Sequence, residues 1–123
     1  MATVRYLVHD VDAVLAFYVD RLGFTLGQRW GPPFATVRRG DLTLWLSGPG
    51  TSASRPMPDG AQPAAGGWNR IVLEVSDFDR TVNALREAGV KLRSNVLTGA
   101  GGRQVLVEDP AGNPVELFEP RET

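Results

Sequence analysis

An internal repeat constrains the fold more than any other feature of this sequence. The second half of the 123-residue chain follows the same order of predicted elements as the first half. Asp10-Val11-Asp12 matches Asp77-Phe78-Asp79, and each triplet begins a predicted helix that is followed by a glycine. Gly40-Asp41 likewise matches Gly112-Asn113, and each pair precedes a predicted strand. Such a repeat indicates two copies of one supersecondary unit.

The first copy has the pattern of a strand, a helix and three further strands. Residues 2–8 alternate between two faces, which predicts a half-buried strand with Arg5 opposite Val4. Apolar residues then recur at three- and four-residue spacing as far as Leu22, which predicts a helix capped by Asp10 or Asp12. The remaining strands of this copy are predicted at Phe24–Trp30, Phe34–Arg39 and Leu42–Ser47.

The second copy repeats this order after a segment of different composition. Residues 48–67 are rich in glycine, proline, serine and alanine, which is typical of a mobile linker or a lid. A helix is predicted from Asp77 to the residue before Gly89. The strands of this copy are predicted at Trp68–Val75, Val90–Arg93, Gln104–Glu108 and Pro114–Glu119.

These elements predict one α+β domain over residues 1–123, with unit 1 at 1–47, a linker at 48–67 and unit 2 at 68–123. Each unit has the order βαβββ. We expect the two units to place eight strands in one curved mixed sheet around a cavity, with both helices outside.

Charge and composition exclude several classes of function. The net charge is −1 and neither sign forms a run, which argues against a nucleic-acid or membrane partner. The chain has no cysteine, which excludes disulfides and thiolate metal sites. Its first residues lack the pattern of a signal peptide, and no stretch is long and apolar enough to span a bilayer. We therefore expect a cytoplasmic protein.

Three segments together resemble one known family. They are Ala16-Phe17-Tyr18 with Leu22-Gly23-Phe24, Val37–Leu42, and the stretch from Asp109 to Leu117. The chain is thereby similar to the vicinal oxygen chelate superfamily, which includes glyoxalases, extradiol dioxygenases, fosfomycin-modifying enzymes and bleomycin-resistance proteins. Val37–Leu42 looks most like the bleomycin-resistance branch. The resemblance covers nearly the whole chain and implies a fold, but a fold does not determine function.

The resemblance also implies where a metal would bind. Metal-dependent members use four positions that face the cavity, and these correspond here to Thr3, Trp45, Arg70 and Glu116. Glu116 is the only one of the four with a metal-binding side chain. We therefore expect no metal and no cofactor, and an ion pair between Arg70 and Glu116 instead. His9, the one histidine, is expected at the surface or at a helix cap.

Aromatic residues suggest what the cavity binds instead. Trp45 alternates with two leucines in its strand, so it faces the cavity if the leucines face the helix. A flat ligand is expected to stack on Trp45 and on Trp30 or Trp68, although each tryptophan alone is as readily explained by core packing. The predicted ligand-binding residues are Trp30, Phe34, Trp45, Trp68, Arg70, Glu74, Glu116 and Phe118. No catalytic residue is predicted.

The leading hypothesis is a non-catalytic protein that sequesters a small, planar, aromatic molecule, as antibiotic-resistance members of the family do. One alternative is a lyase, isomerase or dioxygenase of the same superfamily with an atypical or absent metal site. Another is an accessory subunit without a ligand. The resemblance further implies a symmetric homodimer, since members of the superfamily commonly pair.

Overall fold

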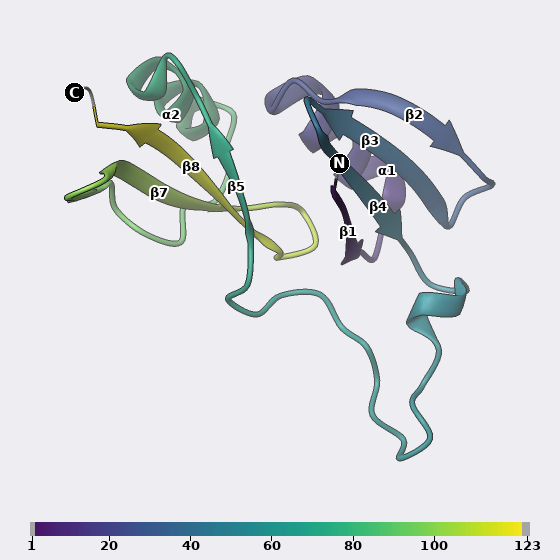
Figure 1. The fold of residues 1–123 in the computed structure, drawn as a ribbon. Helices are drawn as coiled ribbons and strands as arrows, with labels where there is room; N and C mark the ends of the chain where they lie inside the picture. The colour runs from purple at the N-terminus through teal and green to yellow at the C-terminus, as the bar shows by residue number, and fades with distance from the viewer. Residues whose placement is uncertain (1, 122–123) are drawn as a thin grey trace. The chain divides into compact units, whose positions relative to one another are not determined.

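The computed structural model describes residues 2–121, which form two four-stranded mixed sheets (Figure 1). The chain divides into two compact units, Met1–Gly66 and Gly67–Thr123. Each unit has a helix between its first and second strands, so the prediction of an α+β fold with two βαβββ units is confirmed. Hydrogen bonding divides the eight strands into two sheets of four. The ends of the predicted domain, residues 1 and 122–123, lie outside the described residues.

In unit 1 the strand order is β1-β4-β3-β2, with β1 parallel to β4 and the other pairs antiparallel. Helix α1 contacts β3 and β4, and Leu44 and Leu46 are fully buried on that face of the sheet. The elements are β1 (Ala2–Leu7), α1 (Val11–Ala16), a π-helical turn η1 (Phe17–Arg21), β2 (Thr25–Arg29), β3 (Phe34–Arg39), β4 (Leu42–Ser47) and a short 3₁₀ turn η2 (Ser52–Ser54).

Unit 2 has the same topology, with strand order β5-β8-β7-β6. Its helix contacts the central strand β8, and Val115 and Leu117 of that strand are fully buried. Its elements are β5 (Ile71–Glu74), α2 (Phe78–Glu87), β6 (Leu97–Gly99), β7 (Gly102–Glu108) and β8 (Pro114–Pro120). Within residues 2–121, no helix is long and apolar enough to cross a membrane.

The predicted first helix is present but changes its winding halfway. Asp10, one of the two predicted caps, accepts a hydrogen bond at Oδ1 from the Ala13 amide at 3.3 Å. After Ala16 the helix widens into the π turn η1. It ends before Gly23, as expected. The fully buried Tyr18 lies in this turn, in edge contact with Phe17 and with Phe24. The 3.6-residue spacing alone does not predict such a turn.

The strand predicted at Val90–Arg93 is wrong. Only an isolated bridge, Leu92 to Val107, forms there, and the strand beside β7 is β6 at Leu97–Gly99. The Ser94 hydroxyl oxygen accepts the Leu106 amide at 3.0 Å, at a point where a longer ladder would need a main-chain acceptor. A local serine side chain thus ends the pairing.

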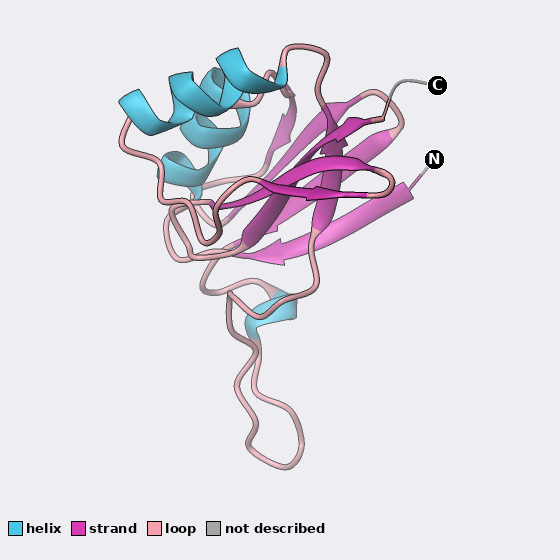
Figure 2. Ribbon diagram, turned by 90° about the vertical axis from the view of Figure 1, so that its left-hand side faces the viewer, coloured by secondary structure: helices cyan, strands magenta, loops and turns pink. Residues whose placement is uncertain are grey.

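Residues 48–67 form a long loop that extends away from the end of β4 (Figure 2). The loop is less irregular than its composition predicts. It contains η2 and a turn in which the amides of Met57 and Gly60 donate to the carbonyls of Ala61 and Met57, both at 2.8 Å. Residues 55–62 are all exposed.

The predicted turn between the last two strands is confirmed. Asp109 is 4% exposed, and its Oδ1 accepts the amides of Ala111 and Asn113 at 2.8 and 3.0 Å. Gly112 has φ of +87°, a conformation that other residues rarely adopt. The turn joins β7 to β8 and thereby sets the position of Glu116.

Candidate ligand-binding site

The face of the unit 1 sheet opposite α1 presents Trp45. Its neighbours Leu44 and Leu46 are fully buried on the helix side, while Trp45 is 37% exposed on the other. The alternation predicted for β4 is therefore present. This second face is hereafter called the open face of unit 1.

Three residues of the open face form one row across three strands. Trp45 in β4 is in register with Arg5 in the parallel strand β1 and with Thr36 in the antiparallel strand β3. The Arg5 guanidinium carbon lies 4.9 Å from the centroid of the Trp45 ring, within the range of a cation–π contact. Arg5 Nη1 also donates to the hydroxyl oxygen of Ser47 at 3.0 Å.

Two further aromatic rings extend this row. The rings of Phe34 and Trp45 are 6.1 Å apart between centroids, and those of Trp30 and Phe34 are 5.8 Å apart. Trp30 and Phe34 flank the Gly31-Pro32-Pro33 turn, and the Trp30 amide donates to the Phe34 carbonyl at 3.0 Å. The Arg29 side chain stabilises the turn by donating hydrogen bonds to the Gly31 and Pro32 carbonyls at 3.0 and 3.3 Å.

Strand β2 contains a bulge where it pairs with β3. The register between β2 and β3 shifts between Leu26 and Arg29, and there the Gln28 amide donates to Thr36 Oγ1 at 2.8 Å. A Cβ atom at position 27 would overlap Thr36 Oγ1, so this close approach requires Gly27.

These side chains line a cavity of about 460 Å³, a volume within the range of small-molecule pockets. Arg5 is the only charged residue in its lining, which contains no acid and no histidine. An arginine does not exchange its proton near neutral pH, so these residues offer no acid–base pair. The cavity is hereafter called the aromatic cavity, and its lining residues are Arg5, Gln28, Trp30, Phe34, Thr36, Trp45, Thr51 and Ser52.

In unit 2, Arg70 and Glu116 form the predicted ion pair. Glu116 is 7% exposed, and its Oε1 accepts bonds from Arg70 Nε and Nη2 at 3.1 and 2.9 Å. The four positions of the family's metal site do not fit a metal, because Thr3, Trp45 and Arg70 supply no metal-type ligand and an arginine neutralises Glu116.

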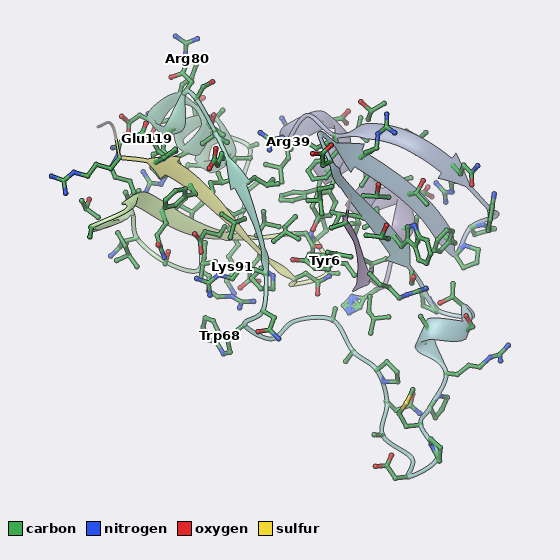
Figure 3. All side chains as sticks on the ribbon, in the orientation of Figure 1. Tyr6, Arg39, Trp68, Arg80, Lys91 and Glu119 are labelled. Atoms are coloured by element: carbon green, nitrogen blue, oxygen red, sulfur yellow. The ribbon has the colours of Figure 1, made fainter. Side chains whose placement is uncertain are left out.

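The other predicted residues of unit 2 lie in different surroundings. Trp68 precedes β5, so the strand predicted from Trp68 is wrong over its first three residues, where Arg70 Nη1 donates to the Trp68 carbonyl instead. The Trp68 indole is 67% exposed and points outward (Figure 3), with the Arg93 guanidinium 4.7 Å from its ring. Glu74 in β5 and Phe118 in β8 are register partners.

A second cavity, of about 700 Å³, adjoins the ends of β7 and β8 in unit 2. Its central cation, Arg103, binds Asp79 at 3.0 Å and Glu119 at 2.8 Å. The hydrogen bond to Asp79, followed by that to Glu119, raises the pKa of Arg103 above its ordinary value. Two carboxylates thus neutralise Arg103, and a second cation, Arg121, also lines this cavity.

Sequence reasoning missed five residues of the aromatic cavity. They come from four segments. Strand pairing brings Arg5, Gln28 and Thr36 beside Trp45, and the loop after β4 supplies the other two. The alternation in residues 2–8 already places Arg5 opposite the partly buried Val4 and the buried Tyr6, so one of the five had a detectable signal. The other four have none, and His9, predicted to be at the surface, is exposed. The missed residues are Arg5, Gln28, Thr36, Thr51 and Ser52.

Comparison with known proteins agrees with this fold. A family model described as the Glyoxalase/Bleomycin resistance protein/Dioxygenase superfamily matches residues 1–117. The uncharacterized protein YwkD of Bacillus subtilis is 32% identical over 127 residues, which cover 94% of this chain and 93% of the relative.

Two solved structures are also similar. One is a member of the same superfamily from Sphaerobacter thermophilus, 28% identical with a TM-score of 0.76 over 97% of this chain and 95% of that one. The other is TnmS3, described as an antibiotic binding protein from Streptomyces sp. CB03234. It is 26% identical with a TM-score of 0.73, over 97% of this chain and 93% of that one.

Proposed function

The chain belongs to the glyoxalase/bleomycin resistance protein/dioxygenase superfamily, and from that premise we propose that it binds a small planar aromatic molecule without transforming it. The ligand would lie in the aromatic cavity, against Trp45 and Trp30. This proposal refines the family assignment, because the superfamily contains both enzymes and binding proteins.

The observation that most favours binding is the composition of the aromatic cavity. Trp30, Phe34 and Trp45 follow one another at centroid distances of 5.8 and 6.1 Å, so they present a continuous apolar surface to a flat ring. The remaining lining residues, Arg5 aside, are neutral and can orient a ligand by hydrogen bonds.

The metal positions favour the same proposal. An enzyme of the metal-dependent kind needs several carboxylate or imidazole ligands around one ion. Here Glu116 accepts two bonds from Arg70, and its counterpart in unit 1 is the indole of Trp45. The similarity to TnmS3, described as an antibiotic binding protein, adds a precedent for binding within the family.

The first prediction tests stacking on Trp45. We expect Trp45→Ala to weaken the binding of naphthamide, a neutral flat aromatic probe, by about tenfold or more, because stacking contributes about 0.5–1.5 kcal/mol beyond the lost burial. Affinity is measured by titration calorimetry. Far-ultraviolet circular dichroism checks the fold, which should persist because Trp45 is partly exposed.

Trp68→Ala is the matched control, since it removes another exposed indole from outside the lining of the aromatic cavity. It should leave the affinity for naphthamide within about twofold, a change that is small on the scale of one stacking contact. Equal affinity of wild type and Trp45→Ala would contradict the proposal, as would the absence of any binding at millimolar naphthamide.

A further inference from the structure

Among residues 2–121, Arg5 is the only charged group that lines the aromatic cavity, and no acidic partner is found for it there. Within residues 2–121, the ion pairs involve other cations and no carboxylate lies against Arg5. The other arginines that lie against aromatic rings differ in this respect. Arg93 binds Glu108 at 3.0 Å, and Arg103 binds Asp79 and Glu119.

The Arg5 guanidinium is held in place without being neutralised. Ser47, a buried residue, accepts one of its N–H groups at 3.0 Å, and the Trp45 ring lies 4.9 Å from its central carbon. A guanidinium has five N–H donors, so most of its donor capacity is not used by these contacts. A fixed guanidinium with unused donors suits an anionic group, which it can bind through two parallel hydrogen bonds.

We propose that the ligand of the aromatic cavity is a planar aromatic acid, with its ring against Trp45 and its anionic group on Arg5. This inference rests on the proposed function and assigns a charge to its ligand. The absence of any acidic residue from the cavity lining favours an anion over a cation, because Arg5 would repel a positively charged ring and no carboxylate of the lining would offset that repulsion.

The second prediction compares two probes of one ring shape, naphthoate, which is anionic at neutral pH, and naphthamide, which is neutral. Wild type should bind naphthoate about tenfold more tightly, the size expected for one charge-assisted hydrogen-bonded contact. Arg5→Met should abolish this preference by weakening naphthoate alone, and Arg5→Lys should retain part of it. All affinities are measured by titration calorimetry at one ionic strength.

Arg38→Met is the matched control. Arg38 extends from the same strand as Thr36 and is exposed, but it does not line the aromatic cavity. This variant has the same net charge as Arg5→Met and should keep the preference for naphthoate. If Arg38→Met loses the preference as fully as Arg5→Met does, general electrostatic attraction explains it and the inference is overturned.

The outcomes separate this inference from the proposed function. If wild type binds the two probes equally and Trp45→Ala weakens both, the cavity binds aromatic rings and only the inferred charge is wrong. If neither probe binds at millimolar concentration, both proposals are overturned. Unchanged thermal unfolding of Arg5→Met shows that a lost preference does not arise from misfolding.

Discussion

Trp45 and Glu116 lie at the two ligand positions that the family resemblance assigns to the last strand of each unit, and their neighbours give them different roles. Each faces away from the helix of its unit, as the alternation of apolar residues predicts. The ion pair of Glu116 with Arg70 was likewise predicted, from the metal-ligand positions that the family resemblance implies. The contact of Arg5 with Trp45 was not predicted, since it depends on the register between two strands that are forty residues apart.

The third prediction concerns the Arg70–Glu116 pair. Arg70→Met should lower the free energy of unfolding by about 1–3 kcal/mol, because it leaves a buried carboxylate without its donors. The loss is smaller than for a fully buried pair because the Arg70 side chain is 27% exposed. Urea unfolding measures the loss. Wild type purified without chelator should also hold no stoichiometric divalent metal, which elemental analysis checks.

Arg80→Met is the matched control, since Arg80 and its partner Asp77 are both mostly exposed. Its effect on unfolding should be within about 0.5 kcal/mol. Adding Glu116→Gln to Arg70→Met should restore part of the lost stability, because an amide is less costly to bury than a charge. A stoichiometric ion that depends on Glu116 would show that our account of this pair is wrong.

At the level of elements, periodicity predicted the strands well and the irregular segments poorly. The predicted bounds of β3 and β4 agree with the structure to the residue, because strong alternation and flanking turns define both ends. The π turn after Ala16 and the displaced strand β6 differ from prediction for local reasons. One follows the packing of Tyr18, and the other follows a serine side chain that replaces a main-chain partner.

The fourth prediction concerns the turn that connects β7 to β8. Asp109→Ala should lower the free energy of unfolding by about 1–3 kcal/mol, because it removes the acceptor of two amides at a buried site. Asp59→Ala is the matched control. Asp59 Oδ1 accepts the Ala61 amide at 2.9 Å in the same manner, but in an exposed loop.

The free energy of unfolding of both variants is measured by urea unfolding, and the slope of each transition is compared with that of wild type. Asp59→Ala should change the stability by no more than about 0.5 kcal/mol. If the two variants lose the same free energy of unfolding, burial does not explain the contribution of Asp109 to stability. A local role in unfolded-state conformation would then be the better explanation.

At the level of the whole molecule, the repeat predicted the topology of both units but not how they differ in use. The same βαβββ topology carries an aromatic cavity in unit 1 and an ion pair in unit 2. The difference arises from a few residues on the faces opposite the helices, while the buried residues beneath them remain apolar in both. The apolar pattern therefore determines the topology. The side chains on the faces opposite the helices, which do not belong to that pattern, distinguish the two units.

The fifth prediction is that the chain forms a homodimer in solution. Small domains bury little surface alone, and unit 2 exposes the apolar residues Val72 and Leu97 by 51% and 53%. Light scattering at micromolar concentration should give twice the chain mass of 13.3 kDa. The doubled mass should persist through tenfold dilution if pairing is strong, and a value of one chain mass throughout would refute the prediction.

The exposed loop after β4 also affects how the chain responds to proteases. Exposed loop tips are the usual places where a folded chain is nicked. Yet Arg55 is the only basic residue between 48 and 67, and Pro56 follows it, so trypsin finds no bond there that it readily cuts. Met57 is likewise followed by Pro58. Trypsin should therefore leave this exposed loop intact, because proline follows the one basic residue that trypsin could recognise there.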